Sequence, residues 1–172
     1  MRSLLILLAS LMLVGCDSFR TINVEVTSEA TISGGGPLLS SLNGLGFGEF
    51  ASFDISNSVE FENNDATRNN IGDSYVTEFT LKVVDPDEQT LKFIESLEVF
   101  IGDGDNPTRV AYLDDDQDTD VTELSLRVYS DREIGQYLRA EKTKVTVEAK
   151  GQPPGEDTTI EATMGFRIKL VF

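Results

Sequence analysis

The sequence predicts an all-β protein: a single antiparallel β-sandwich with roughly seven to nine strands and one or two short helical turns. Three observations support this prediction. Apolar and polar residues alternate with a period of two in six separate segments, which is typical of half-buried strands. Clusters of glycine, proline, asparagine and aspartate separate these segments, and helical periodicity is scarce.

The predicted strands follow one another along the whole chain. The alternating segments are residues 22–27, 79–83, 97–101, 124–128, 145–149 and 166–172, and two shorter candidates are 59–61 and 110–113. Turn residues lie between them at 34–37, 63–65, 85–87, 102–107 and 151–155. Such spacing favours one sandwich over a helical or mixed fold.

Two segments have helical character. Leucines at helical spacing occupy residues 38–45, where Gly44 and Gly46 limit a helix to about two turns. A second short turn is predicted at 134–138.

The N-terminus is a processing segment. Arg2 supplies a positive charge, and Leu4 to Val14 is an apolar run broken by Ser10. This run is well short of the ~20 residues that cross a bilayer as a helix, and it ends at Cys16, the single cysteine of the chain. A basic start, a short apolar run and small residues before a cut are typical of a secretory signal.

The four residues Leu13-Val14-Gly15-Cys16 resemble the lipobox of bacterial lipoproteins. The resemblance implies cleavage after Gly15 and a diacylglyceryl group on the Cys16 thiol. The predicted organisation is then a signal peptide at 1–15, a lipidated cysteine and short tether at 16–21, and a β-sandwich domain at 22–172. Asp17 occupies the position of the inner-membrane retention signal of enteric bacteria; other bacteria do not all follow that rule, so both membranes stay open.

Charge and composition exclude several classes of function. The chain after residue 15 has 13 basic and 30 acidic residues, a formal charge of 13 − 30 = −17, so phosphate backbones repel it and nucleic acid is not an expected partner. The chain contains no histidine, which excludes Ser-His-Asp and Cys-His catalysis and histidine-ligated metals. We expect a protein that is not an enzyme.

The strongest polar motif is an aspartate series. Asp114, Asp116, Asp118 and Asp120 recur at every second position, and Asp103 and Asp105 form a nearby acidic loop. Oxygen-rich loops of this kind bind Ca²⁺, although the spacing is not that of an EF-hand. The alternative is a solvated acidic edge, the commoner arrangement for charge runs.

An apolar set follows the first predicted strand. It consists of Leu38, Leu39, Leu42, Leu45 and Phe47, with Phe50 and Phe53 beyond. The set is a candidate face for an apolar ligand or for the membrane, and its alternative is a small element that closes the core, as apolar residues at helical spacing usually do.

Three functional hypotheses follow for an exported, membrane-anchored body at the periplasmic face or cell surface. The first is a non-catalytic binding or structural module with an envelope protein as partner and membrane lipid held through acylated Cys16. The second is a Ca²⁺-stabilised adhesin or scaffold domain, and the third is a carrier of a lipid or other apolar ligand. In strand count and spacing the body resembles immunoglobulin-like sandwiches such as LEA14-like proteins, a resemblance of fold that implies no activity.

Overall fold

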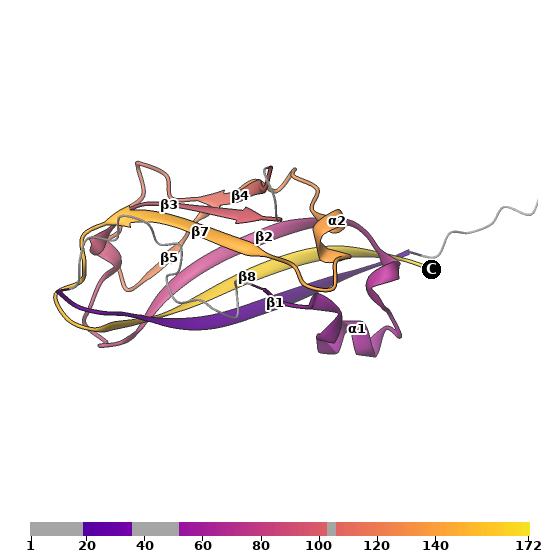
Figure 1. The fold of residues 1–172 in the computed structure, drawn as a ribbon, viewed down its shortest axis with the longest axis horizontal. Coiled ribbons are helices and arrows are strands. Elements are labelled where there is room, and N and C mark those ends of the chain that lie inside the picture. Colours follow the sequence, from indigo (N-terminus) through magenta and orange to yellow (C-terminus); the bar gives the residue numbers. More distant parts are fainter. Residues whose placement is uncertain (1–18, 36–51, 103–105) are drawn as a thin grey trace, which may run out of the picture.

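The computed structural model describes residues 19–35, 52–102 and 106–172. In these ranges the chain forms two four-stranded antiparallel sheets packed face to face (Figure 1), which confirms the predicted sandwich. The first sheet has the order β1-β8-β2-β5 and the second the order β6-β4-β3-β7.

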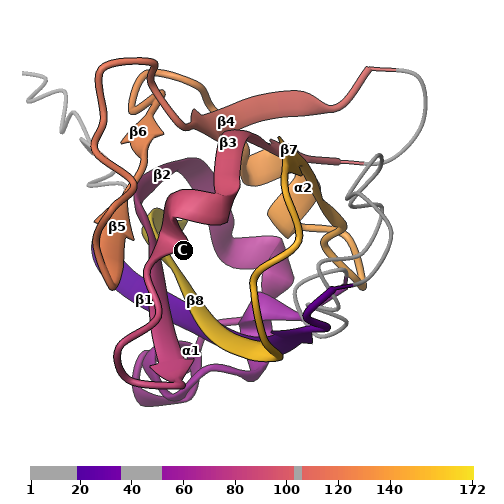
Figure 2. The same ribbon diagram turned by 90° about the vertical axis from the view of Figure 1, so that its left-hand side faces the viewer.

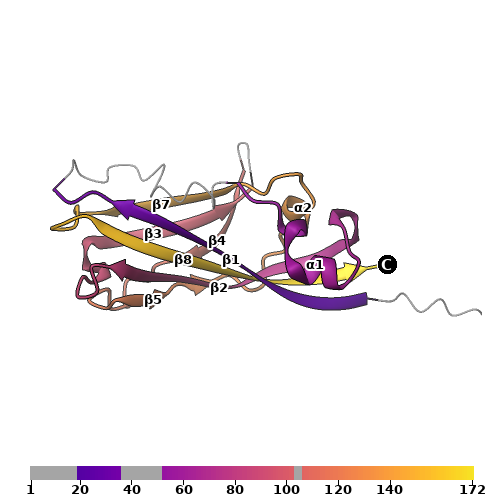
Figure 3. The ribbon, with the colours of Figure 1, turned by 90° about the horizontal axis from the view of Figure 1, so that it is seen from below.

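Three of the four strands of the first sheet are long, and this sheet carries about half of the core. Their bounds are β1 Phe19–Ile32, β8 Thr158–Val171, β2 Ile71–Asp85 and β5 Glu123–Ser125. β8 lies between β1 and β2 and pairs with both along nearly its whole length (Figure 3). On β8 the alternate residues from Ile160 to Leu170 are all fully buried, so the alternating strand predicted at 166–172 is confirmed and begins earlier, at Thr158.

The second sheet is shorter and covers the apolar face of the first. It contains β6 Arg127–Val128, β4 Thr108–Tyr112, β3 Ile94–Ile101 and β7 Val145–Gly151. Leu97, Val99 and Ile101 point into the core from β3 with at most 1% exposure. The 3₁₀ turn η3, Leu91–Phe93, leads into β3 and buries both of its apolar residues.

The strand order differs from that of an immunoglobulin domain while the sandwich architecture is shared. An immunoglobulin domain places its last strand in the sheet opposite its first two strands. Here the C-terminal strand β8 lies between the first and the second strand. Both ends of the described chain therefore lie at one end of the sandwich, where Phe19 pairs with Val171.

Two predicted strands differ in the structure. Residues 59–61 belong to helix α1, Val59–Asn63, in which Phe61 is fully buried and Val59 is 63% exposed. An alternation only three residues long does not distinguish a strand from one helical turn, and the acidic residues Glu60 and Glu62 favour the positive N-terminus of a helix. The prediction of a strand here was wrong.

Residues 124–128 form two strands in place of one. β5 pairs with β2 in the first sheet, and β6 pairs with β4 in the second, so the chain changes sheets at the buried Leu126. Figure 2, seen along the sandwich, shows β5 and β6 at one side between the two sheets. A period of two is the same whichever sheet a strand joins, so the alternation does not reveal the change.

Short helical elements gather at the end where β1 begins (Figure 1). They are α1, the 3₁₀ turns η1 Ile55–Asn57 and η2 Arg68–Asn70, and α2 Gly135–Leu138. The helical turn predicted at 134–138 is confirmed by α2. The first strand begins at Phe19, three residues before the predicted start at Ile22.

Candidate functional site: an arginine–tyrosine cluster on the second sheet

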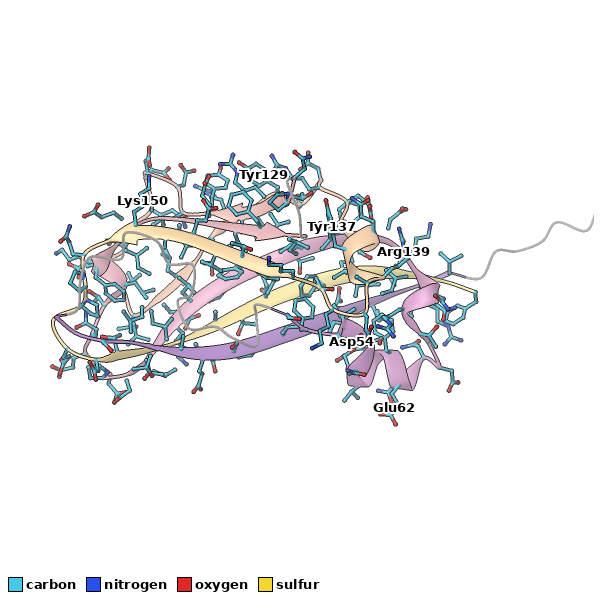
Figure 4. The ribbon with its side chains drawn as sticks, viewed as in Figure 1. Asp54, Glu62, Tyr129, Tyr137, Arg139 and Lys150 are labelled. Carbon is cyan, nitrogen blue, oxygen red and sulfur yellow. The ribbon has the colours of Figure 1, made fainter. Side chains whose placement is uncertain are left out.

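Aromatic and charged side chains gather on the outer face of the second sheet, around Arg109 of β4. Its guanidinium forms an ion pair with Glu98 of β3 and donates a hydrogen bond of 2.7 Å to the hydroxyl of Tyr129. The rings of Tyr112 and Tyr129 lie 5.1 Å apart. Arg132 lies 3.7 Å above the centre of the Tyr129 ring. We call these five residues the Arg109 cluster, and Figure 4 labels Tyr129 on the side of the sheet that faces away from β1.

A β-bulge places this cluster on one face. Val99 pairs with Ala111 but Phe100 pairs with Arg109, so Val110 is an extra residue in β4. Residues three apart on a regular strand point to opposite faces, and the extra residue changes that relation. Arg109 and Tyr112 therefore lie outside together, while the two residues between them are buried.

The cations of the cluster are held by several contacts each. The hydrogen bond that Arg109 donates to Glu98, opposed by partial burial, raises the pKa of the Arg109 guanidinium above its ordinary value, so the guanidinium stays charged at neutral pH. The Cζ atom of Arg109 lies 5.2 Å from the centre of the Tyr129 ring and 5.7 Å from the centre of the Tyr112 ring. The guanidinium of Arg132 donates a hydrogen bond of 2.6 Å to the backbone carbonyl of Arg109. Such preorganised tyrosine and arginine side chains are the types enriched at protein interfaces.

The aspartate series lies between β4 and β5, and its members turn to different partners. Asp114 and Asp116 lie 3.5 and 3.7 Å from the guanidinium of Arg127. Asp118 accepts a hydrogen bond of 2.8 Å from the backbone of Asp120. Within the parts of the chain that the structure describes, no three acidic, histidine or cysteine side chains form a group able to hold a metal ion.

Asp120 ends the series and joins it to the segment before β3. Its carboxylate accepts hydrogen bonds of 3.0 Å from the ammonium of Lys92 and from the hydroxyl of Thr90. Both contacts lower the pKa of Asp120 below its ordinary value, and the hydrogen bond from Lys92 has the larger effect. The described aspartates thus stabilise a loop in this structure.

We expect thermal unfolding curves in EDTA, in magnesium and in millimolar calcium to coincide, because Arg127 already pairs with Asp114 and Asp116, and Lys92 with Asp120. A ligand present at 100 times its dissociation constant would add about 2.7 kcal/mol to the free energy of unfolding. Scanning calorimetry of the purified chain measures this directly. A rise in melting temperature specific to calcium would contradict this expectation and support the Ca²⁺ site predicted from the sequence.

The contact with Lys92 predicts a pH effect at Asp120. Because the folded pKa is lowered relative to the unfolded chain, this carboxylate stabilises the fold above the unfolded pKa, and the contribution is lost as the pH falls through the folded pKa. In a carboxyl-detected NMR titration, we expect the Lys92→Met variant to shift the pKa of Asp120 upward. Replacing the exposed Lys82 by methionine is the control, and an equal shift in both variants would contradict the contact.

The remaining predicted site residues lie outside the described residues. These are Gly15, Cys16, Asp17, Leu38, Leu39, Leu42, Leu45, Phe47, Asp103 and Asp105. Of the longer apolar set, Phe53 is described: it is half-buried, pairs with Thr143 and lies 5.6 Å from the ring of Phe166. At this position the apolar set contributes to the core.

Sequence reasoning missed the Arg109 cluster. Its signal in the sequence is a pair of one arginine and one tyrosine on each side of the aspartate series: Arg109 and Tyr112 before it, Tyr129 and Arg132 after it. These side chains come together because of the bulge in β4 and because the chain passes from one sheet to the other at Leu126. Neither feature changes the alternation of apolar and polar residues in the sequence.

Comparisons with known proteins add little to this description. No family model matches the chain, and no curated protein matches it. Among solved structures, a chain of the acidic stable capsid structure of Helicobacter pylori bacteriophage KHP30 is similar over 90% of this chain and 100% of that one, with 12% identity and a TM-score of 0.38. At that TM-score the likeness supports no conclusion about this chain. None of the helices in the described ranges is long and apolar enough to cross a membrane.

Proposed function

We propose that this chain is a lipid-anchored bacterial lipoprotein whose exported, acidic β-sandwich acts as a non-catalytic binding or structural module at the cell envelope. The observation that carries the proposal is Leu13-Val14-Gly15-Cys16 at the end of a short apolar run. Two or three acyl chains on Cys16 would hold the protein stably, since stable anchoring takes two signals.

The start of the first strand supports an anchor of this kind. β1 begins at Phe19, so only Asp17 and Ser18 separate the lipobox cysteine from a strand that pairs along the whole sandwich. A β-sandwich domain so close to Cys16 would be held next to its membrane. Partners would therefore bind to surfaces of the domain that do not contact the lipid.

The Arg109 cluster is the surface that we propose for the partner. It lies on the outer face of the second sheet, its side chains are positioned before any partner arrives, and preorganised aromatic and arginine side chains lose little freedom on binding. The partner itself would be an envelope protein.

Replacing Cys16 by serine tests the anchor. In bacteria that express the full chain, we expect the wild type to extract from membranes with an intact mass that begins at Cys16 and includes acyl chains. The Cys16→Ser variant should lack that mass and keep residues 1–15. Ser18→Ala, just after the cut, serves as the matched control and should match the wild type, whereas an unmodified, soluble wild-type chain would refute the proposal.

A photo-crosslinking amino acid in place of Tyr112 tests the binding surface in intact cells. Tyr75, which lies 5.4 Å below Arg167 on the first sheet, provides a matched position outside the Arg109 cluster. We expect a defined crosslinked species from position 112 that position 75 does not give, and that Arg109→Ala removes. Equal crosslinks from both positions would count against this surface.

A further inference from the structure

We infer that the end of the sandwich at which β1 begins is a membrane-contacting surface, which stands on the lipid headgroups of the bilayer that holds the acyl chains. The inference rests on the proposed lipid anchor and adds to it an orientation and a contact surface. We call this end the anchor end. Three independent features of the described residues point to it: the entry point of the chain, the exposed apolar side chains and the distribution of charge.

The entry point brings the anchor end to the membrane. Cys16 precedes Phe19 by three residues, and three residues span at most about 10 Å. Phe19 is the first residue of β1 and pairs with Val171, the last residue of β8. The strand then runs for 14 residues, so the opposite end lies about 45 Å further along the strand axis.

Exposed apolar side chains gather at the same end. The large hydrophobic residues that are exposed in the described ranges are Val59, Val171 and Phe172, at 63%, 43% and 51%. Val171 and Phe172 end the chain beside the start of β1, where the guanidinium of Arg20 lies 5.9 Å from the ring of Phe172.

A hydrogen bond holds helix α1, which begins at Val59, at the same end of the sandwich. Val59 begins α1, and Arg20 donates a hydrogen bond of 3.2 Å to Asn64, just after that helix. Figures 1 and 3 show α1, the start of β1 and the C-terminus together at one end. Apolar side chains there would enter the interface between headgroups and acyl chains, as they do in peripheral membrane proteins.

Charge separates along the same axis. A line across the first sheet through the paired positions Val24, Phe166 and Val76 divides the molecule. On the anchor side are residues 19–24, 52–76, 133–144 and 166–172, which carry seven basic and seven acidic side chains, a net charge of 7 − 7 = 0. Figure 4 labels three of these charged residues there, Asp54, Glu62 and Arg139.

The rest of the described chain carries all of the net negative charge. It has six basic and nineteen acidic side chains, a net charge of 6 − 19 = −13. Anionic headgroups repel such a surface within a Debye length of about 8 Å. The neutral end can approach the bilayer while the acidic end is held away, so the charge distribution and the tether favour one orientation.

Depth-dependent fluorescence quenching tests the orientation in the full, lipidated chain. Single cysteines are introduced at Val59 and, as the distal control, at Gly155, which lies in the loop before β8 and has open space for a side chain. Each chain is labelled with a fluorophore and reconstituted in phosphatidylcholine–phosphatidylglycerol vesicles that contain nitroxide-headgroup lipid. Because the tether holds the anchor end within about 10 Å of the lipid, we expect the label at 59 to lose about half of its fluorescence and the label at 155 to lose none.

Two further measurements separate the explanations. In the Val59→Cys chain, the additional changes Val171→Asp and Phe172→Asp should restore the fluorescence toward the distal value. Equal quenching at both positions, or none at either, overturns the inference. If Val59→Cys chains instead crosslink to each other and nitroxide lipid does not quench them, the end is an interface between two copies and the inference is likewise overturned.

Intact mass distinguishes a failure of the orientation from a failure of the anchor. An acylated chain that floats with the vesicles but shows no quenching at 59 overturns the inference and leaves the proposed lipoprotein standing. A chain without acyl mass that stays in solution overturns both.

Discussion

Replacing Phe166 by alanine is expected to lower the free energy of unfolding by about 3–5 kcal/mol. Phe166 is fully buried in β8, between the paired positions Val24 of β1 and Val76 of β2. Its ring also lies 5.6 Å from Phe53. Because β8 is paired on both sides, the backbone around the missing ring has little freedom to collapse into the cavity.

A loss of this size is a large part of the stability of an ordinary domain, about 5–15 kcal/mol. For a chain of this length it corresponds to a fall in melting temperature of roughly 6–20 °C, which calorimetry or circular dichroism measures. Val59→Ala, at an exposed valine, is the control and should change the stability by less than about 0.5 kcal/mol. A similar small effect from Phe166→Ala would mean that the two sheets do not pack as described.

Replacing Gly135 by alanine should also destabilise the fold, by about 1–3 kcal/mol. Gly135 begins α2, and an added Cβ would overlap the backbone carbonyl oxygen of Gly72 at the start of β2 and lie 2.6 Å from a carboxylate oxygen of Glu133. Alanine suits a helix better than glycine by about 0.5–1 kcal/mol. The overlap is with backbone, which cannot rotate away, so we expect the clash to exceed the gain in helix propensity.

Two controls isolate that clash. Gln136→Ala changes an exposed side chain in the same helix, and Gly155→Ala adds a Cβ that meets nothing within 4 Å. Both should leave the urea midpoint almost unchanged, whereas Gly135→Ala should lower it and increase hydrogen exchange at Ile134, whose amide is bonded to the Ser74 carbonyl at 2.9 Å. A Gly135→Ala variant as stable as the wild type would show that α2 does not pack closely on β2.

The sandwich could be predicted because its strands have one apolar face each. The segment 166–172 shows this: Phe166, Ile168 and Leu170 are buried, and Arg167 between them is exposed. Successive side chains on a strand point to opposite faces of the sheet. A strand with one buried face therefore has apolar residues at every second position, and this pattern can be seen in the sequence.

Elements that depend on a neighbour could not be predicted in the same way. Residues 59–61 alternate like a strand but form α1, because too few residues are present for either period to be distinguished. The crossing at Leu126 is also invisible, since the strand partners on either side of it are β2 and β4, far away in sequence.

The candidate site follows the same division. The tyrosines and arginines of the Arg109 cluster can be read from the sequence. That Arg109 and Tyr112 share a face, however, depends on the β-bulge in β4 opposite Val99 and Phe100. The aspartate series was visible as a run of charge, while its contacts with Arg127 and Lys92 come from separate strands and turns.

The sequence by itself determined the all-β class, the inward parity of the long strands, the acidic character of the body and the four residues whose resemblance to a lipobox is the basis of the proposed anchor. These are local properties, set by the order of apolar, polar and charged residues along a few positions. The tertiary structure alone decided that β8 lies between β1 and β2, that the neutral, apolar end coincides with the start of β1, and which aromatic side chains meet on the second sheet. Those features depend on pairings between residues up to 152 positions apart, as between Phe19 and Val171, and a pairing of that kind leaves no periodic mark in either partner.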